Sequence, residues 1–344
     1  MKQMQSSFIK QAAQSHGFAL CGIAKSDILT IEKERFTKAL SHNYHAQKAY
    51  LERDIEKRFH AQLLLENCKS VIVCGFNYNM RRSVSGFSQY ALIKDYHIFM
   101  KEKLEGLAMS LKKEYGAFQY KTTVDSSAIS EKAWAVKSGI GYYGKNGIIQ
   151  TSAGSFVFLG ILLIDSEVEM YDTSNTMTCG NCNRCIEACP AKAIVEPYYI
   201  DCNQCITHLN THKNESDFAR GVKYGWFYAC DVCQNVCPNN VDAPINEEAI
   251  ALQVPFVENI DEILTTLTPE SFEQYFKDTV FYKFKYEGLK KRIEIHNLYF
   301  YKIFKKNRVF FYICIFFSQQ LCQKMQKMKN NVLKKRFCTL SAKK

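Results

Sequence analysis

The sequence predicts an α/β (α+β) N-terminal domain, followed by a small cysteine-built domain and a short helical C-terminal region. Three observations support this prediction. Strand-like apolar runs and helical patterns share residues 1–170, cysteines cluster in residues 171–245, and helix signals dominate residues 246–290. With 344 residues, 47% of them hydrophobic, the chain is long enough to bury the cores of two or three domains.

The N-terminal region carries the clearest strand signals. Ser70 to Gly75 and Phe156 to Ile164 are short apolar runs of the kind that forms buried strands. Between them, Glu102 to Tyr115 places apolar residues among charged ones. This pattern predicts an amphipathic helix that packs on the sheet.

Nine cysteines lie between residues 179 and 237, in clusters that are unlike the even spread of a disulfide framework. One motif is Cys179-x2-Cys182-x2-Cys185-x3-Cys189-Pro190, and the other is Cys230-x2-Cys233-x3-Cys237-Pro238. The first matches the bacterial run in which three cysteines ligate one 4Fe-4S cluster and the fourth ligates a second cluster. The spacing therefore predicts a ferredoxin-like domain over residues 171–245 that holds two clusters for electron transfer.

The same exchange of ligands, applied to both motifs, gives two ligand sets. The first cluster is ligated by Cys179, Cys182, Cys185 and Cys237. The second is ligated by Cys189, Cys230 and Cys233, with either Cys202 or Cys205 as the fourth ligand. Two zinc knuckles are the alternative, but zinc does not need the repeated x3-Cys-Pro ending.

Residues 121–165 combine glycines and polar residues with apolar strands. Asp125 follows a strand-like stretch, and Glu131 to Val136 has the pattern of the next helix. Gly139 to Asn146 is a glycine-rich turn that also carries Lys145. Such a turn is by itself a weak signal for a ligand site, because most glycine-rich turns serve only the backbone.

Taken together, these motifs resemble the epoxyqueuosine reductase family. The matching stretches are Val124-Asp125-Ser126-Ser127, Glu131-Lys132-Ala133-Trp134-Ala135, Gly139 to Asn146, Gly154-Ser155, the first cysteine motif, Asp201-x3-Cys205-Ile206-Thr207, and Ala229-Cys230 through Asn240. Lys57-Arg58 and Tyr90-Ala91-x3-Asp95-Tyr96-His97 are similar to the family's N-terminal motifs. The resemblance spans residues 1–290.

The resemblance implies an oxidoreductase with a cobalamin-binding catalytic domain over residues 1–170. Such an enzyme reduces epoxyqueuosine to queuosine at the wobble position of tRNA, with electrons from an external low-potential donor passing through the two clusters to cobalamin. Asp125 matches the family's proton donor, and we expect burial under the cofactor to raise its pKa. The alternative role for Asp125 is a cap on the helix that contains Glu131.

The resemblance also implies a set of cobalamin contacts. These are Arg58, His97, Asp125, Gly144, Lys145, Asn146, Ser155 and Thr207. It favours Cys205 as the displaced cluster ligand, because Ile206-Thr207 follows it, and leaves Cys202 as a spare thiol. The alternative function is a cobalamin and iron–sulfur electron-transfer protein, or a reductase similar to reductive dehalogenases.

Two internal segments and the C-terminal tail depart from the family pattern. His208-Leu209-Asn210-Thr211-His212 stands where the family has Tyr-Leu-Thr-Ile-Glu, and Ile93 stands at an expected glycine. Residues 291–344 form a basic and aromatic tail that we do not expect to be family sequence. From Tyr282 to Lys344 the chain has 17 Lys and Arg against two acidic residues, so the rest of this +11 chain is slightly acidic.

Composition also bears on partners and location. We expect tRNA to meet local basic residues near the cofactor, with Lys94, Lys132 and Lys223 as candidates. The N-terminus lacks the apolar core of a signal peptide, and the longest apolar run, Val309 to Phe317, is far shorter than the ~20 residues of a membrane span. We therefore expect a cytoplasmic monomer with no membrane contact.

Overall fold

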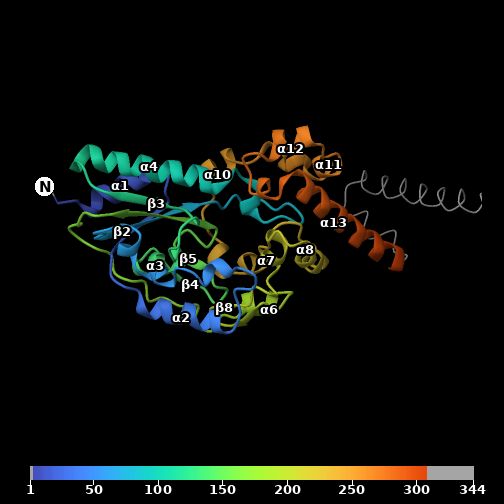
Figure 1. The fold of residues 1–344 in the computed structure, drawn as a ribbon, viewed down its shortest axis with the longest axis horizontal. Coiled ribbons are helices and arrows are strands. Elements are labelled where there is room, and N and C mark those ends of the chain that lie inside the picture. The colour runs from blue at the N-terminus through green and yellow to red at the C-terminus, as the bar shows by residue number, and fades with distance from the viewer. Residues whose placement is uncertain (1–2, 308–344) are drawn as a thin grey trace, which may run out of the picture. The chain divides into compact units, whose positions relative to one another are not determined.

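A computed structural model describes residues 3–307 of the chain. At the centre of its N-terminal region is a four-stranded sheet with strand order β1-β2-β6-β3 (Figure 1). The strands are β1 (Leu20–Lys25), β2 (Ser70–Asn77), β3 (Tyr120–Thr123) and β6 (Val157–Ile164). All three pairings are antiparallel, so this region is of the α+β kind and not a parallel α/β sheet.

The two central strands, β2 and β6, are those that the apolar runs predicted. β2 pairs with β6 along its whole length, from Ser70 opposite Ile164 to Asn77 opposite Val157. Every residue of β2 is buried. Because helices cover both faces of the sheet, these strands are continuous apolar runs without polar alternation.

Helices pack on both faces of the sheet. α1 (Ser6–Ser15) and α4 (Tyr96–Tyr115) lie together along one face (Figure 1), and α5 (Glu131–Lys137) packs on the other. Trp134 of α5 is buried with Val71 and Leu163 in a hydrophobic core. α4 begins earlier than predicted because the Asp95 side chain accepts a hydrogen bond from the backbone N–H of His97 and caps the helix there.

Other short elements complete the N-terminal region. They are α2 (Thr30–Ser41), α3 (Ile55–Phe59), β4 (Gly141–Tyr143) and β5 (Ile149–Thr151). β4 and β5 form a hairpin around the predicted glycine-rich turn. A Cβ atom at Gly144 would lie 2.7 Å from the side chains of Asn146 and Gln150, so packing within this hairpin already requires a glycine.

The cysteine-rich region is built from short elements. They are α6 (Arg184–Ala188), β7 (Ile194–Glu196), β8 (Tyr199–Ile200), α7 (Ile206–Thr211), α8 (Glu215–Gly221) and α9 (Val232–Asn235). α6 packs against α9, and α7 packs against α8. Each cysteine motif therefore contains one helix of the α6–α9 pair.

The C-terminal part of the described chain is helical, as predicted. Its helices are α10 (Glu247–Ala251), α11 (Ile260–Thr265), α12 (Pro269–Phe276) and α13 (Lys285–Asn307). Thr268 caps α12 through a capping box with Ser271. Among residues 3–307, no helix is both long enough and apolar enough to cross a membrane.

The chain divides into two units, Met1–Leu289 and Lys290–Lys344. Everything described below lies in the first unit. The predicted aromatic run from Val309 to Phe317, and most of the predicted tail, lie outside the described residues.

Candidate active site

Two neighbouring pockets lie in the first unit. The cluster-side pocket, of about 490 Å³, is lined by Cys189, Cys205, Cys230 and Cys233 together with aromatic residues such as Tyr96 and Phe158. The outer pocket, of about 580 Å³, is lined by Arg35, Arg53, Arg58, Tyr143 and Tyr198 among others. Five residues line both pockets: Asp125, Glu131, Lys132, Gly147 and Ile200. Asp125 therefore stands where the two pockets meet.

The loop after β3 holds Asp125 in an unusual backbone conformation. Its φ of 49° lies in the left-handed region, which Asp tolerates better than most residues. The backbone N–H of Asp125 donates a hydrogen bond of 2.5 Å to Oε1 of Glu131. Asp125 does not cap α5, because the N-cap residue of that helix is Ser130. The helix-capping alternative for Asp125 is therefore wrong.

Side chains of α4 bind the carboxylate of Asp125. Tyr96 donates its hydroxyl to Oδ2 of Asp125 at 3.0 Å, and Nε2 of His97 lies 3.7 Å from the same oxygen. The other ring nitrogen of His97, Nδ1, lies 2.7 Å from Oδ1 of Asp95. His97 thus bridges the two carboxylates of Asp95 and Asp125.

These contacts set the protonation states of the loop. Burial works to raise the pKa of Asp125, but hydrogen bonds from His97 and Tyr96 and the charges of His97 and Lys132 lower it overall. Burial lowers the pKa of His97, yet its bonds to Asp125 and Asp95 outweigh burial and raise the pKa to about 9. Burial, with the adjacent charge of Asp125, raises the pKa of Glu131 to about 8. In this loop the carboxyl with a raised pKa is Glu131, whereas the pKa of Asp125, which we expected to be raised, is lowered.

The cysteine thiols fall into two neighbour groups. Burial raises the pKa of Cys185, and the nearby thiols of Cys179 and Cys237 raise it further. Cys179 and Cys182 act in the same way on Cys237, whose pKa burial also raises. This is the group that the ligand exchange predicted for the first cluster.

The second neighbour group contains the displaced cysteine. Burial raises the pKa of Cys230 to about 12, and Cys205 and Cys189 are thiols that raise it further. Burial also raises the pKa of Cys233, which has Cys230, Cys205 and Cys189 as neighbours and also Cys185 of the first group. Cys202 lies beside Cys205, whose pKa is raised by burial and further by Cys202, and Lys48 Nζ donates a hydrogen bond of 3.3 Å to the Cys202 sulfur. Cys205 neighbours both Cys230 and Cys233, so it stays the predicted fourth ligand.

Two buried polar residues position the second group. The Asn210 side chain, on α7, accepts a hydrogen bond from the Ala229 N–H at 2.7 Å and donates one to the Ala229 carbonyl at 2.9 Å. These two bonds fix the backbone of the residue before Cys230. Asp231 accepts hydrogen bonds from the Ser88 hydroxyl at 2.5 Å and the Gln89 N–H at 2.7 Å. Asp231 thereby ties the second cysteine motif to the N-terminal region.

The predicted cobalamin contacts separate into three sets. Asp125, Asn146, Ser155 and Thr207 line the cluster-side pocket. Arg58 lines the outer pocket instead. His97, Gly144 and Lys145 line neither of these pockets. His97 reaches the site through Asp125, whereas Lys145 donates its amine to Oδ1 of Asn183 at 2.9 Å.

Ser155 is held firmly at the wall of the cluster-side pocket. Its N–H donates to Oδ1 of Asn240 at 2.7 Å, and its hydroxyl accepts from Nδ2 of the same residue at 2.9 Å. Gln234 donates to the Ser155 carbonyl at 3.0 Å. Asn240 and Gln234 flank Cys237, so the second cysteine motif orients this wall.

Comparisons with known proteins identify the two halves of this site. Residues 178–240 match the family model of the 4Fe-4S double cluster binding domain, and residues 58–126 match that of epoxyqueuosine reductase QueG. The epoxyqueuosine reductase of Cyclobacterium marinum is 35% identical over 295 residues, which cover 83% of this chain and 94% of that protein. That of Cellulophaga algicola is 35% identical over 302 residues, covering 85% and 98%.

The chain belongs to the epoxyqueuosine reductase family. Solved structures agree: a crystal structure of selenomethionine-labelled epoxyqueuosine reductase superposes with a TM-score of 0.76 at 26% identity, covering 88% of this chain and 83% of that one. A second, of epoxyqueuosine reductase with a tRNA-Tyr epoxyqueuosine-modified stem loop, gives 0.75 at 26% identity, covering 86% and 81%.

Family membership decides between the alternatives raised by the sequence. The resemblance to epoxyqueuosine reductases is confirmed, and so is the reading of the cysteines as a 4Fe-4S double cluster domain, which sets aside the zinc knuckles. Family membership also favours an enzyme that acts on tRNA over an electron carrier or a reductase similar to dehalogenases.

Sequence reasoning missed two residues of this epoxyqueuosine reductase site. It read Glu131 only as part of a helix and Tyr96 only as part of a motif, yet both contact Asp125. A signal for Tyr96 was present in the sequence. Asp95 before an amphipathic run indicates a helix start, and this places Tyr96 in the first turn of that helix, at its N-terminal end.

Proposed function

We propose that this chain removes the epoxide oxygen of epoxyqueuosine in tRNA to give queuosine, with Asp125 as the proton donor. One observation carries the proposal: Asp125 stands where a pocket lined by cluster cysteines meets a second pocket lined by arginines and tyrosines. A proton donor at that junction faces a cofactor on one side and a substrate on the other.

The cluster-side pocket suits cobalamin. Its wall is mostly aromatic and apolar, with Tyr90, Tyr96 and Phe158, and it offers a few fixed polar groups from Asn146, Ser155 and Thr207. This combination fits a flat macrocycle whose edge carries amides. Asn146, Ser155 and Thr207 would hold cobalamin there, and the chemistry it would supply is that of a low-valent cobalt able to attack or reduce the strained epoxide.

The iron–sulfur clusters supply the electrons, one at a time. Cys179, Cys182, Cys185 and Cys237 hold one cluster, and Cys189, Cys205, Cys230 and Cys233 hold the other. All four cysteines of the second set line the cluster-side pocket, whereas none of the first set does. The second cluster is therefore the one next to cobalamin.

The chemistry requires protons as well as electrons. Removing the epoxide oxygen as water takes two electrons and two protons. Asp125 donates to the departing oxygen, and His97, whose raised pKa keeps it protonated at neutral pH, lies 3.7 Å from Oδ2 of Asp125 and returns a proton to it. A cofactor over the loop adds desolvation, which acts to raise the pKa of Asp125.

The outer pocket takes the modified nucleoside. Arg35 and Arg53 supply positive charge for the phosphates beside it. Arg58 is buried there, and its Nε–H finds no hydrogen-bond acceptor among residues 3–307. Lys132 lines both pockets, so it is the best placed of the three lysines predicted to meet tRNA. Lys94 and Lys223 serve the more distant phosphates.

The remaining expectations belong to the same proposal. We assign residues 1–170 to the cobalamin-binding catalytic domain, 171–245 to the ferredoxin-type domain and 246–290 to a helical region, with 291–344 as a tail outside the family sequence. The enzyme acts as a cytoplasmic monomer supplied by an external low-potential donor.

The test combines cofactor analysis with an assay. Protein purified without oxygen should contain about eight iron atoms per chain and bind one cobalamin. A stem loop carrying epoxyqueuosine should then be converted to the queuosine form, detected by mass spectrometry, while the same stem loop with an unmodified base serves as control. Iron without cobalamin binding would leave a two-cluster electron carrier and contradict the proposal.

A further inference from the structure

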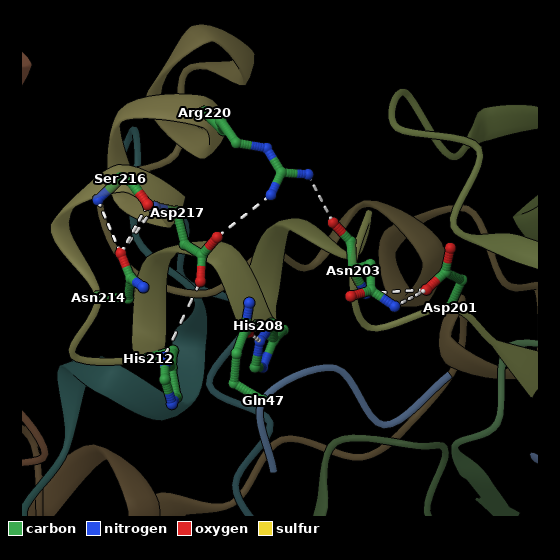
Figure 2. Close-up of polar contacts among 9 residues, drawn as sticks. All are labelled: Gln47, Asp201, Asn203, His208, His212, Asn214, Ser216, Asp217 and Arg220. Atoms are coloured by element: carbon green, nitrogen blue, oxygen red, sulfur yellow. Dashed lines mark hydrogen bonds and ion pairs between the residues drawn. The ribbon is translucent and has the colours of Figure 1, made fainter. Parts of the chain in front are cut away.

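We propose that His208, His212 and Asp217 form a binding site for a divalent transition-metal ion, separate from both iron–sulfur clusters. His208 lies on α7, His212 directly follows that helix, and Asp217 lies in the first turn of α8 (Figure 2). One potential ligand atom from each residue lies within 4.8 Å of the other two. The spacing of four residues places both imidazoles on one face of the helix.

The donor set is one that zinc uses. Two imidazole nitrogens and one carboxylate oxygen bind zinc at ~2.0–2.2 Å and leave a fourth position for water. Tetrahedral geometry then sets ligand atoms about 3.3 Å apart. Nδ1 of His212 and Oδ2 of Asp217 are 4.0 Å apart, too far for a hydrogen bond. A movement of roughly 1 Å brings them to a common ion.

The Asp217 carboxylate points to an ion more strongly than the histidines do. Its side chain is only 4% exposed. Oδ1 accepts a hydrogen bond from Arg220 at 3.2 Å, but Oδ2 accepts none among residues 3–307. Within the described part of the chain, Oδ2 makes a long ion pair of 4.0 Å with Nδ1 of His212. Burying a carboxylate oxygen without a hydrogen bond costs free energy, and an ion bound between these two atoms removes that cost.

Polar neighbours already orient the three side chains. The Asn214 side chain accepts from the N–H groups of Ser216 and Asp217 and so fixes the start of α8. Gln47 Oε1 lies 2.9 Å from Nε2 of His208, and Arg220 also donates to the Asn203 carbonyl (Figure 2). Outer partners of this kind are typical of metal sites, where they hold the ligands in place.

The site has a structural consequence for the second cluster. α7 begins directly after Cys205, so an ion at its far end braces the helix that presents this displaced ligand. The two histidines fall in the segment where the sequence departs from its family. We therefore assign the ion to this chain, independently of the proposed reaction.

The experiment uses the full chain, purified without oxygen and loaded with iron, then equilibrated with Zn²⁺ and desalted. We expect one zinc per chain in addition to the iron, and a zinc X-ray absorption spectrum with nitrogen and oxygen neighbours. His212→Gln and Asp217→Asn should each weaken zinc retention by ~100-fold or more, since each removes a ligand. His42→Gln, at an exposed histidine of the same protein, should retain the ion.

Thermal unfolding provides a second readout. Zinc should raise the Tm of the wild-type chain and leave that of His212→Gln unchanged, provided that both keep the same iron content. Two results would overturn the site: zinc that is retained equally by His212→Gln, or zinc with a sulfur-only coordination shell, which would place it on cluster cysteines.

Discussion

The two cysteine sets differ in how the fold assembles them. Three ligands of the first set come from one continuous motif, Cys179 to Cys185, and none lines the cluster-side pocket. The second set draws on three separate segments, through Cys189, Cys205 and the Cys230 motif, and all of its members line that pocket. In the proposed function the first cluster receives electrons and the second delivers them. The first set joins two segments of the chain, because Cys237 completes it, whereas the second set joins three.

The strongest test of this difference removes one ligand from each set. Cys182→Ser and Cys230→Ser should each lower the iron content from about eight to about four atoms per chain. Both should lose more than ~1,000-fold in activity with a protein donor, because either break interrupts electron delivery. A small reductant that reaches the second cluster directly should restore activity to Cys182→Ser alone.

Cys202→Ser is the matched control for this experiment. Because the thiol of Cys202 accepts a hydrogen bond from Lys48 and does not neighbour Cys230 or Cys233, we expect the variant to keep all its iron. If Cys202→Ser loses half of the iron while Cys205→Ser does not, the assignment of the displaced ligand is wrong.

Replacing Asp125 tests the role of the residue that stands where the two pockets meet. Asp125→Asn keeps the shape of the side chain but has no acidic proton, so kcat should fall by ~10²–10⁴-fold, the usual contribution of a general acid. Iron content and cobalamin binding should match the wild type. Parallel loss of cobalamin binding would show that Asp125 holds the cofactor, and the proton-donor role would then lack support.

Arg53 tests the outer pocket. Arg53→Gln removes one positive charge near the proposed nucleoside site, so the Kd for the epoxyqueuosine stem loop should rise by about 5–10-fold at low salt and less at high salt. Binding measured by fluorescence anisotropy checks this. Lys113→Gln, on the exposed side of α4, is the control, and equal losses in the two variants would argue against a specific role of the outer pocket.

The smallest expected effect is that of replacing His97, and it concerns the thermal stability of the fold. In the folded protein the pKa of His97 is about 9, above the ordinary histidine pKa of 6.5. The contacts of protonated His97 with Asp95 and Asp125 therefore stabilise the fold fully below pH 6.5, and this stabilisation is lost as the pH rises through 9. The Tm of His97→Gln should therefore lie about 1–2 °C below wild type at pH 6. The gap should close above pH 9.5, and a gap independent of pH would mean that packing, not charge, accounts for it.

Most of the cluster ligands could be proposed from the sequence because their spacing is local. The motifs from Cys179 to Cys189 and from Cys230 to Cys237 follow the spacing of known cluster motifs, and the fold brings Cys179 beside Cys237 and Cys189 beside Cys230. Cys205 could not be chosen over Cys202 on spacing, since only two residues separate them and both line the pocket. That choice needed the resemblance, and it stays a prediction until iron is measured.

The protonation states of the active site could not be predicted in the same way. The partners of Asp125 come from α4 and α5, and it is the fold that brings Tyr96, His97 and Glu131 to one carboxylate. The placement of Arg58 in the outer pocket likewise follows from α3, whose position no local pattern fixes. The antiparallel order of the sheet escaped prediction for the same reason, because strands far apart in the chain pair there.

The bonds of Asp231 to Ser88 and Gln89 have a consequence for maturation of the enzyme. Asp231 lies between two cluster ligands, and the residues that it binds lead into the wall of the cluster-side pocket. A chain that has not yet received its second cluster has no metal to hold Cys230 and Cys233, so this wall is incomplete. We therefore expect the iron–sulfur clusters to be inserted before cobalamin binds, and we expect oxygen damage to the second cluster to weaken cobalamin binding as well.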